Sequence, residues 1–192
     1  MEIILSSASP SELMLGKLIG LGAAGLIQML IWFLLGAASV ALLHLTQLRF
    51  SPETFLFCFV YFLLGYVLYG SLMLGFGALG TNLRESQQMA SIWTLLGASP
   101  VMVLIALLEA PQGRLARIFS YIPFTAPTTM MFRYAIDPKG TPWLDIAGST
   151  LVLGVSTYVA LRASARLYRA GLLLYGKRPG VREIWRWLVA AR

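Results

Sequence analysis

The sequence has few charged residues and almost no cysteine or histidine. Of its 192 residues, 12% are charged and 58% are hydrophobic, with a mean hydropathy of +0.75 and a net charge of +7. This balance excludes an ordinary soluble enzyme. The single cysteine, Cys58, excludes an internal disulfide, and the single histidine, His44, excludes the usual histidine-rich metal sites and catalytic triads. The sequence therefore predicts no catalytic residue, no metal site and no cofactor bound by this chain.

Long uncharged runs predict an all-α, polytopic membrane protein with four spanning helices. The first run holds 26 residues between Lys17 and His44, which at about 1.5 Å per residue exceeds the roughly 30 Å hydrocarbon core. The third contains Pro100, which should kink or locally open the helix. The fourth is short and needs Arg162 to snorkel at its end. We predict spans at 18–43, 55–80, 90–108 and 144–164.

The predicted extracellular loop, residues 109–143, contains a second kind of apolar segment. Residues 118–132 carry no charge, but Pro123 and Pro127 oppose a continuous spanning helix. We expect a re-entrant or interfacial pair of short helices, because broken backbone at membrane depth survives only where protein or water satisfies it. A surface loop with an apolar patch is the alternative.

The distribution of basic residues predicts the orientation of the spans. Four crossings place both ends of the chain on one side, and the positive-inside rule makes that side cytoplasmic. The inner segments then hold Lys17, Arg84, Arg162, Arg166, Arg169, Lys177, Arg178, Arg182, Arg186 and Arg192, whereas the outer segments hold Arg49, Arg114, Arg117, Arg133 and Lys139. The ratio of ten to five favours cytoplasmic ends in a cell membrane.

The first 17 residues contain a well-defined helix start beside the membrane. Ser9 suits the N-cap, Pro10 the first helical position, and Glu12 the reciprocal position of a capping box. The spacing of Gly16, next to Lys17, and Gly20 would allow another helix to approach closely. The simple interpretation is a capped entry into a membrane helix. The sharper one is a cytoplasmic docking element for a partner protein.

The last 28 residues, 165–192, form a basic tail with two tryptophans. We expect it to lie on the anionic inner leaflet, with Arg166, Arg169, Lys177 and Arg178 toward the headgroups and Trp185 and Trp187 at the interface. The segment GLLLYGK resembles a phosphate-binding loop, but an arginine follows where Ser or Thr should bind magnesium, so we reject that interpretation. Nucleic-acid binding is not expected.

Polar side chains within the spans are few. Most should serve as hydrogen-bonding contacts between helices. Gln28, Tyr66 and Ser71 are our candidates for a transport pathway, and Gln28 stands out because an unpaired amide in mid-span is costly. No Asp, Glu, Lys, Arg or His occupies the middle of a span, which argues against a proton relay and against an intramembrane enzyme.

Four stretches resemble, in order, the permeases of type-2 ABC exporters, particularly the sodium-efflux branch. EIILSSASPSELMLGKLIG resembles their cytoplasmic elbow, and GYVLYGSLMLGFGALGTNLRESQQ the helix and inner turn that follow. YIPFTAPTTMMFR resembles the outer Pro-rich segment, and RLYRAGLLLYGKRPGVREIWRWL the C-terminal tail. The family permease has six membrane helices, so the resemblance implies that this chain is the C-terminal part of a longer protein.

The resemblance also implies roles for individual residues. Ser9, Pro10, Glu12, Gly16 and Lys17 would form the coupling helix on which a separate ATPase subunit, carrying ATP and magnesium, docks. Pro123, Pro127, Met130 and Arg133 would form an outer gate. The membrane unit would be a homodimer or a paired permease, and the substrate sodium, a drug or a lipid. The alternative is a truncated permease or a non-transporting membrane partner protein.

Overall fold

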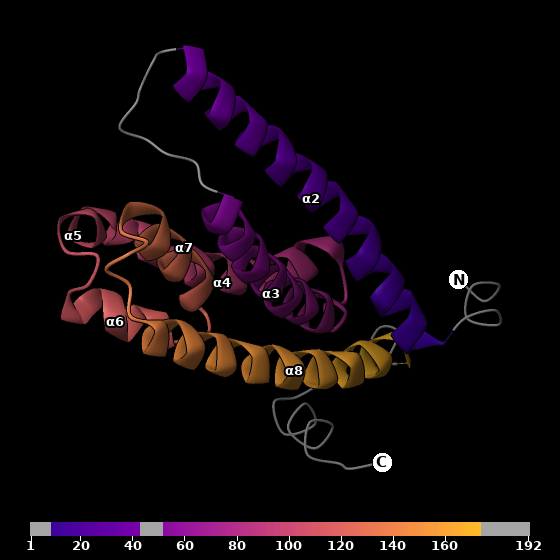
Figure 1. The fold of residues 1–192 in the computed structure, drawn as a ribbon. Helices are drawn as coiled ribbons and strands as arrows, with labels where there is room; N and C mark the ends of the chain where they lie inside the picture. The colour runs from indigo at the N-terminus through magenta and orange to yellow at the C-terminus, as the bar shows by residue number, and fades with distance from the viewer. Residues whose placement is uncertain (1–8, 43–51, 174–192) are drawn as a thin grey trace.

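The computed structural model describes residues 9–42 and 52–173, and in these ranges the chain is helical without strands (Figure 1). The helices are α2 (Pro10–Leu42), α3 (Pro52–Gly77), α4 (Leu83–Met102), α5 (Leu104–Glu109), α6 (Arg114–Tyr121), α7 (Ala126–Ile136) and α8 (Trp143–Leu173). The predicted all-α class is thus confirmed for the described residues.

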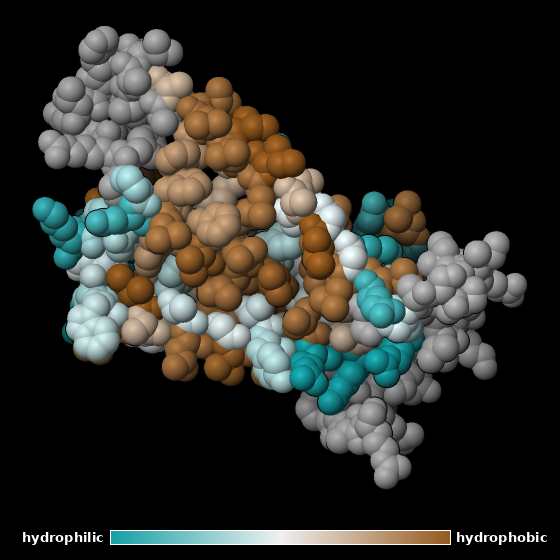
Figure 2. Space-filling view, turned by 45° about the vertical axis from the view of Figure 1, so that its right-hand side comes forward, coloured by the Kyte–Doolittle hydropathy of each residue, from teal (hydrophilic) through white to brown (hydrophobic). Residues whose placement is uncertain are grey.

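Three of the described helices are long and apolar enough to cross a membrane. The candidate spans are Glu12–Gly36, Pro52–Gly77 and Trp143–Gly171. Figure 2 shows apolar side chains across the middle of the molecule and hydrophilic ones gathered toward two opposite ends, as expected for a membrane protein. The helix α4 is not among the three candidates, so the predicted third span, 90–108, stays a prediction.

The helix α3 lies at the centre, and contacts along its length define the direction of its neighbours. The helices α2 and α3 are antiparallel. Near the start of α2 the Leu18 carbonyl accepts from the Tyr66 hydroxyl, and further along α2 the Phe33 ring lies 4.3 Å from the ring of Phe55, which comes earlier in α3. Beside α8 both helices run the same way, because Tyr61 contacts Ser149 and Gly75 contacts Ser164. The start of α2, the turn after α3 and the end of α8 therefore share one end of the molecule (Figure 1).

The best-packed part of the molecule lies where α3, α7 and α8 meet. Its buried hydrophobic residues are Tyr61, Leu68, Leu72, Met130, Leu153 and Ala160. The Tyr61 hydroxyl lies 2.5 Å from Ser149 Oγ and 2.8 Å from Thr150 Oγ1. Because a buried hydroxyl without a partner is costly, these contacts fix the rotation of α8 against α3.

The predicted third span, 90–108, is not one continuous helix. The nitrogen of Pro100 carries no hydrogen, so it cannot bond the Leu96 carbonyl as a regular helix requires. The Ser99 hydroxyl donates to this carbonyl instead, at 2.7 Å, a substitution typical of membrane helices. The helix ends at Met102, and α5 begins after Val103, whose φ of −109° and ψ of 18° are not helical. The helix is therefore interrupted beside Pro100, as its missing N–H led us to expect.

Two of the long helices extend across the predicted boundaries between a span and its flanking segment. The helix α2 runs without interruption through the predicted elbow and the predicted first span, as a capped entry into a membrane helix requires. The last helix continues beyond residue 164 to Leu173, so the first part of the predicted tail is helical. In both places the charged residues lie on exposed helix faces.

Candidate functional site

The N-terminus of α2 has the capping geometry that its sequence predicts. The Glu12 carboxylate accepts hydrogen bonds from the Ser9 backbone nitrogen and from the Ser9 hydroxyl, both at 2.7 Å. The Ser9 hydroxyl oxygen in turn accepts from the Glu12 backbone nitrogen at 3.3 Å. Pro10 is the first helical residue. The bonds from the Ser9 and Glu12 backbone nitrogens satisfy two donors that a helix start leaves open.

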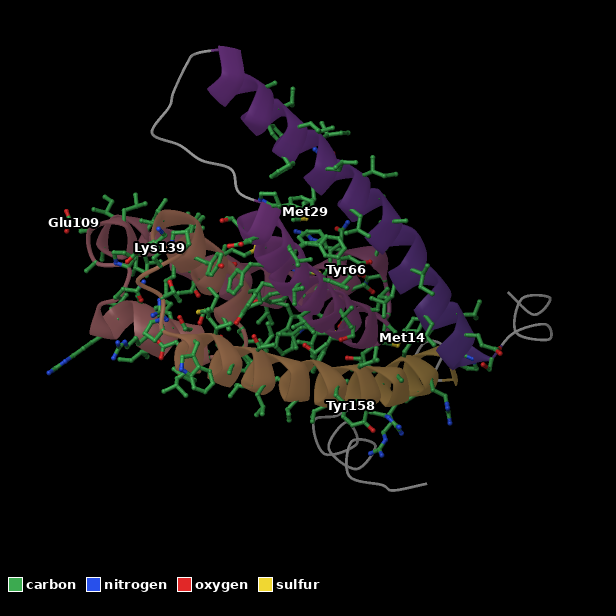
Figure 3. All side chains as sticks on the ribbon, in the orientation of Figure 1. Met14, Met29, Tyr66, Glu109, Lys139 and Tyr158 are labelled. Carbon is green, nitrogen blue, oxygen red and sulfur yellow. The ribbon has the colours of Figure 1, made fainter. Side chains whose placement is uncertain are left out.

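The elbow packs directly on the end of α8. Met14 and Leu18 are buried together with Tyr168, and the Lys17 ammonium lies 5.7 Å above the centre of the Tyr168 ring. Figure 3 shows Met14 where α2 approaches α8. Gly16, by contrast, has open space around it. A force on the elbow would therefore reach α8 through side-chain contacts, without an intervening loop.

The three candidate pathway residues do not meet in one place. The Tyr66 side chain lies between α3 and α2 and is bonded to the Leu18 carbonyl at 2.7 Å (Figure 3). The Ser71 side chain is fully buried, and its hydroxyl donates to the Leu68 carbonyl at 2.9 Å. Gln28 is exposed on α2. The Tyr66 bond joins α3 to α2, whereas the Ser71 bond stays within α3, and the pathway role of all three residues stays a prediction.

The Pro-rich segment folds into two short helices, α6 and α7, joined by a turn at 122–125. The turn lies beside the C-terminal half of α3, where the Tyr69 hydroxyl donates to the Phe124 carbonyl. Half-buried Pro123 is in the turn. From there α7 returns along α3 in the opposite direction, with Pro127 against Gly65. A Cβ at Gly65 would lie 2.8 Å from Pro127 Cβ, so only glycine permits this approach.

The buried Arg133 joins α7 to three other segments. Its side chain is 0% exposed. The guanidinium donates to the Pro111 carbonyl at 2.8 Å, Ser120 Oγ at 2.8 Å, Gln112 Oε1 at 2.7 Å and Asp145 Oδ2 at 2.7 Å. A fifth, weaker bond reaches the Met130 sulfur at 3.6 Å. All five N–H groups therefore have acceptors, which offsets the cost of burying the charge.

The acceptor of this ion pair, Asp145, begins α8 and was not predicted as a site residue. Its Oδ1 accepts from the Tyr121 hydroxyl at 3.2 Å, and its Oδ2 lies 3.5 Å from Arg117 Nε. Desolvation, and after it the nearby Asp145 carboxylate, raises the pKa of the Tyr121 phenol. We name Arg133, Asp145, Ser120 and Gln112 the outer clamp.

The predicted anchoring residues are only partly described. Arg166 and Arg169 are exposed on the last turns of α8, at the same end as the elbow. Lys177, Arg178, Trp185 and Trp187 lie outside the described residues.

A sequence comparison decides the family. The profile of the ABC-2 family of transporter proteins matches residues 1–166, which include the elbow, the α3–α8 core and the outer clamp. The chain belongs to this ABC-2 transporter family. Membership makes it a membrane protein of that family, in agreement with the three apolar helices of the described structure.

Two curated relatives of this ABC-2 chain have 31% identical residues. One is the uncharacterized protein MJ1024 of Methanocaldococcus jannaschii, matched over 91% of this chain and 42% of its own length. The other is the uncharacterized protein YhaP of Bacillus subtilis, matched over 96% of this chain and 46% of its own. The chain thus spans less than half the length of these relatives. No solved structure matches it.

Proposed function

We propose that this chain is the membrane-spanning part of a permease in an ABC exporter, driven by a separate ATPase subunit that binds ATP and magnesium. ABC-2 membership supports the class of protein. The observation that carries the mechanism is the elbow, whose capped helix start packs through Met14 and Leu18 on Tyr168 of α8. Such an element offers an ATPase a firm attachment and transmits its movement.

The proposed transport mechanism is alternating access. Closure of the ATPase subunits around ATP would displace Ser9, Pro10, Glu12, Gly16 and Lys17, and the continuous helix α2 would carry this displacement into the membrane. Because Leu18 bonds Tyr66 of α3 and Met14 packs on α8, both neighbours would respond. Packed helices change between discrete arrangements, so inward-open and outward-open states follow.

At the opposite end, the α6–α7 hairpin is the proposed outer gate. Pro123, Pro127, Met130 and Arg133 belong to it, as the family resemblance implies. Its turn reaches the inner half of α3 through Tyr69 and Phe124, which supports a re-entrant path into the membrane. The clamp through Arg133 would make this hairpin move with the start of α8.

The proposed setting follows from the same resemblance. We place four spans in the plasma membrane, with both ends of this chain cytoplasmic and the basic tail on lipids of the inner leaflet. The unit would be the C-terminal part of a six-helix permease that works as a homodimer or with a paired permease. The chain matches less than half the length of each of the two relatives, which supports the proposal of a longer protein.

The proposed substrate is sodium, with a drug or lipid as the alternative. The resemblance to the sodium-efflux branch favours sodium. The middle of the described spans carries no acidic ligand for a cation, and Asp145 at the start of α8 is already engaged by Arg133. Sodium release measured from proteoliposomes that contain the full permease and its ATPase would distinguish the two substrates.

The experiment that tests the assembly is purification of the tagged chain from native membranes in mild detergent, followed by identification of bound proteins and an ATPase assay. We expect a stoichiometric ATP-binding subunit. If neither the folded chain nor a longer form of the protein co-purifies with an ATP-binding subunit, the chain is a non-transporting membrane partner protein instead.

Removing the charges of the elbow is expected to uncouple the ATPase. The variant E12Q/K17Q keeps a glutamine oxygen for the capping box while it removes both charges. We expect substrate-dependent stimulation of ATP hydrolysis to fall at least tenfold, which corresponds to a loss of about 1.4 kcal/mol in coupling free energy. The matched control is Lys139→Gln, an exposed cation at the opposite end. Unchanged stimulation in E12Q/K17Q would remove the elbow from the mechanism.

A further inference from the structure

An exposed apolar stripe runs along the outer side of α8. Its members are Leu144, Leu151, Val155 and Tyr158, which follow one another at helical spacing. Tyr158 lies on the side of α8 that faces away from α3 (Figure 3). The stripe ends at Arg162, whose guanidinium lies 5.2 Å from the centre of the Tyr158 ring. Because α8 is a candidate span, lipid is the natural neighbour of this stripe.

The helix α6 completes the stripe at its other end. At Gly148 the stripe has no side chain, and the Tyr121 ring covers this position: a Cβ at Gly148 would lie 2.9 Å from the ring. The same helix exposes Leu115 and Ile118, whereas its Ala116 and Ser120 are buried. The apolar surface therefore continues from α8 onto α6.

Two arginines border this surface on α6. The Arg117 side chain is 53% exposed, and its Nε is 3.5 Å from Asp145. Asp145 is already bonded to Arg133 at 2.7 Å and to Tyr121, so it leaves most of the Arg117 guanidinium available. Arg114 lies one turn earlier on α6, is exposed, and has no ion pair within the described residues. Both guanidinium groups can bind a phosphate.

The distance between the charged ends of the surface matches a bilayer. Arg117 is level with Asp145 through their contact, and Arg162 follows 17 residues later on the same helix. At 1.5 Å per residue the two arginines are about 26 Å apart along α8, close to the roughly 30 Å thickness of the hydrocarbon core. When Arg162 lies at the headgroups of one leaflet, the arginines of α6 therefore lie at the headgroups of the opposite leaflet.

We propose that this surface binds a phospholipid of the leaflet at the α6 end. Arg114 and Arg117 hold the phosphate, and the acyl chains lie along Leu115, Ile118 and Leu144. Glu109 and Lys139 are also exposed at this end of the molecule (Figure 3). Lipid binding at this site requires neither ATP hydrolysis nor transport, so it can be tested separately from the proposed function. It fastens α6, and through Asp145 the outer clamp, to the membrane.

Lipid retention tests the proposal. The chain is purified in mild detergent, and native mass spectrometry counts the phosphatidylglycerol or phosphatidylcholine that stays bound. We expect one retained lipid, with phosphatidylglycerol preferred because of its net negative charge. In R114Q/R117Q the occupancy should fall about tenfold, whereas Arg84→Gln, an exposed cation on α4, should leave it unchanged. Equal occupancy in R114Q/R117Q would overturn the proposal, and so would release of the lipid by millimolar inorganic phosphate.

A second measurement locates the surface in a bilayer. A spin label is attached at I118C in a C58S background, because Cys58 is the only native cysteine. In phospholipid nanodiscs the label should collide readily with oxygen and poorly with a water-soluble nickel complex, as lipid-facing sites do. Strong collision with nickel would place this face in water and contradict the lipid site.

Discussion

Arg133→Met is expected to destabilise the folded protein by about 3 kcal/mol, because removal of one member of a buried ion pair leaves the other uncompensated. Asp145 would keep the looser contact with Arg117 and the bond from Tyr121, which places the loss near the lower end of the usual range. Ser120 and Gln112 would lose their donor as well. The free energy of unfolding in bicelles, titrated with sodium dodecyl sulfate, measures the effect.

Three variants separate the ion pair from other causes. Arg133→Lys keeps the charge but cannot reach four oxygen acceptors with one ammonium, so an intermediate loss is expected. The double variant R133M/D145N should lose less unfolding free energy than the sum of the two single variants, because it leaves no unpaired charge at positions 133 and 145. Lys139→Met, exposed at the same end, should change stability by less than about 0.5 kcal/mol. A loss in R133M no larger than this control would show that the clamp is unimportant for stability.

Gly75→Ala is expected to destabilise the contact between α3 and α8. The added Cβ would lie 2.7 Å from both Cα and Cβ of Ser164, and backbone cannot move aside as a flexible side chain can. Replacement of a helical glycine by alanine normally stabilises by about 0.5–1 kcal/mol, whereas overpacking costs about 1–3 kcal/mol. We therefore expect a net loss of about 1–2 kcal/mol in the same titration.

Gly154→Ala is the matched control for Gly75→Ala. Gly154 lies on α8, and nothing approaches its Cβ position within 4 Å. The same chemical change should here stabilise the protein by up to about 1 kcal/mol. The two glycines thus predict opposite signs, and a gain of stability in both variants would contradict the close contact at Gly75.

The sequence predicted the apolar helices well because a membrane span is a local property of some twenty residues. It also located the helix start at Ser9 and the break after Pro100, since caps and prolines act on neighbouring backbone. The residues at which the helices end were harder to predict from the sequence. In the sequence, a charge such as Arg162 or Arg166 indicates the end of a span, but a helix continues past such charges when they face outward.

The outer clamp shows what could not be predicted. Arg133 was singled out through its position in the Pro-rich segment, but its acceptor, Asp145, follows twelve residues later across a turn whose path the sequence does not define. A buried arginine requires an acid, and the only signal was an acidic residue at the start of an apolar helix. The hydroxyls that meet Tyr61 were equally hidden, because pairing depends on the rotation of two distant helices.

The parallel packing of α3 and α8 has a consequence for biosynthesis. Tyr61 and Ser149 are 88 residues apart in the sequence, so at roughly 5–20 residues per second the ribosome makes the second one about 4 to 18 seconds after the first. During this interval the face of α3 with Tyr61 and Gly75 lacks the helix that covers it. Membrane insertion of the last helix therefore completes the core, and a nascent chain stalled before Trp143 would expose that face to any other helix in the bilayer.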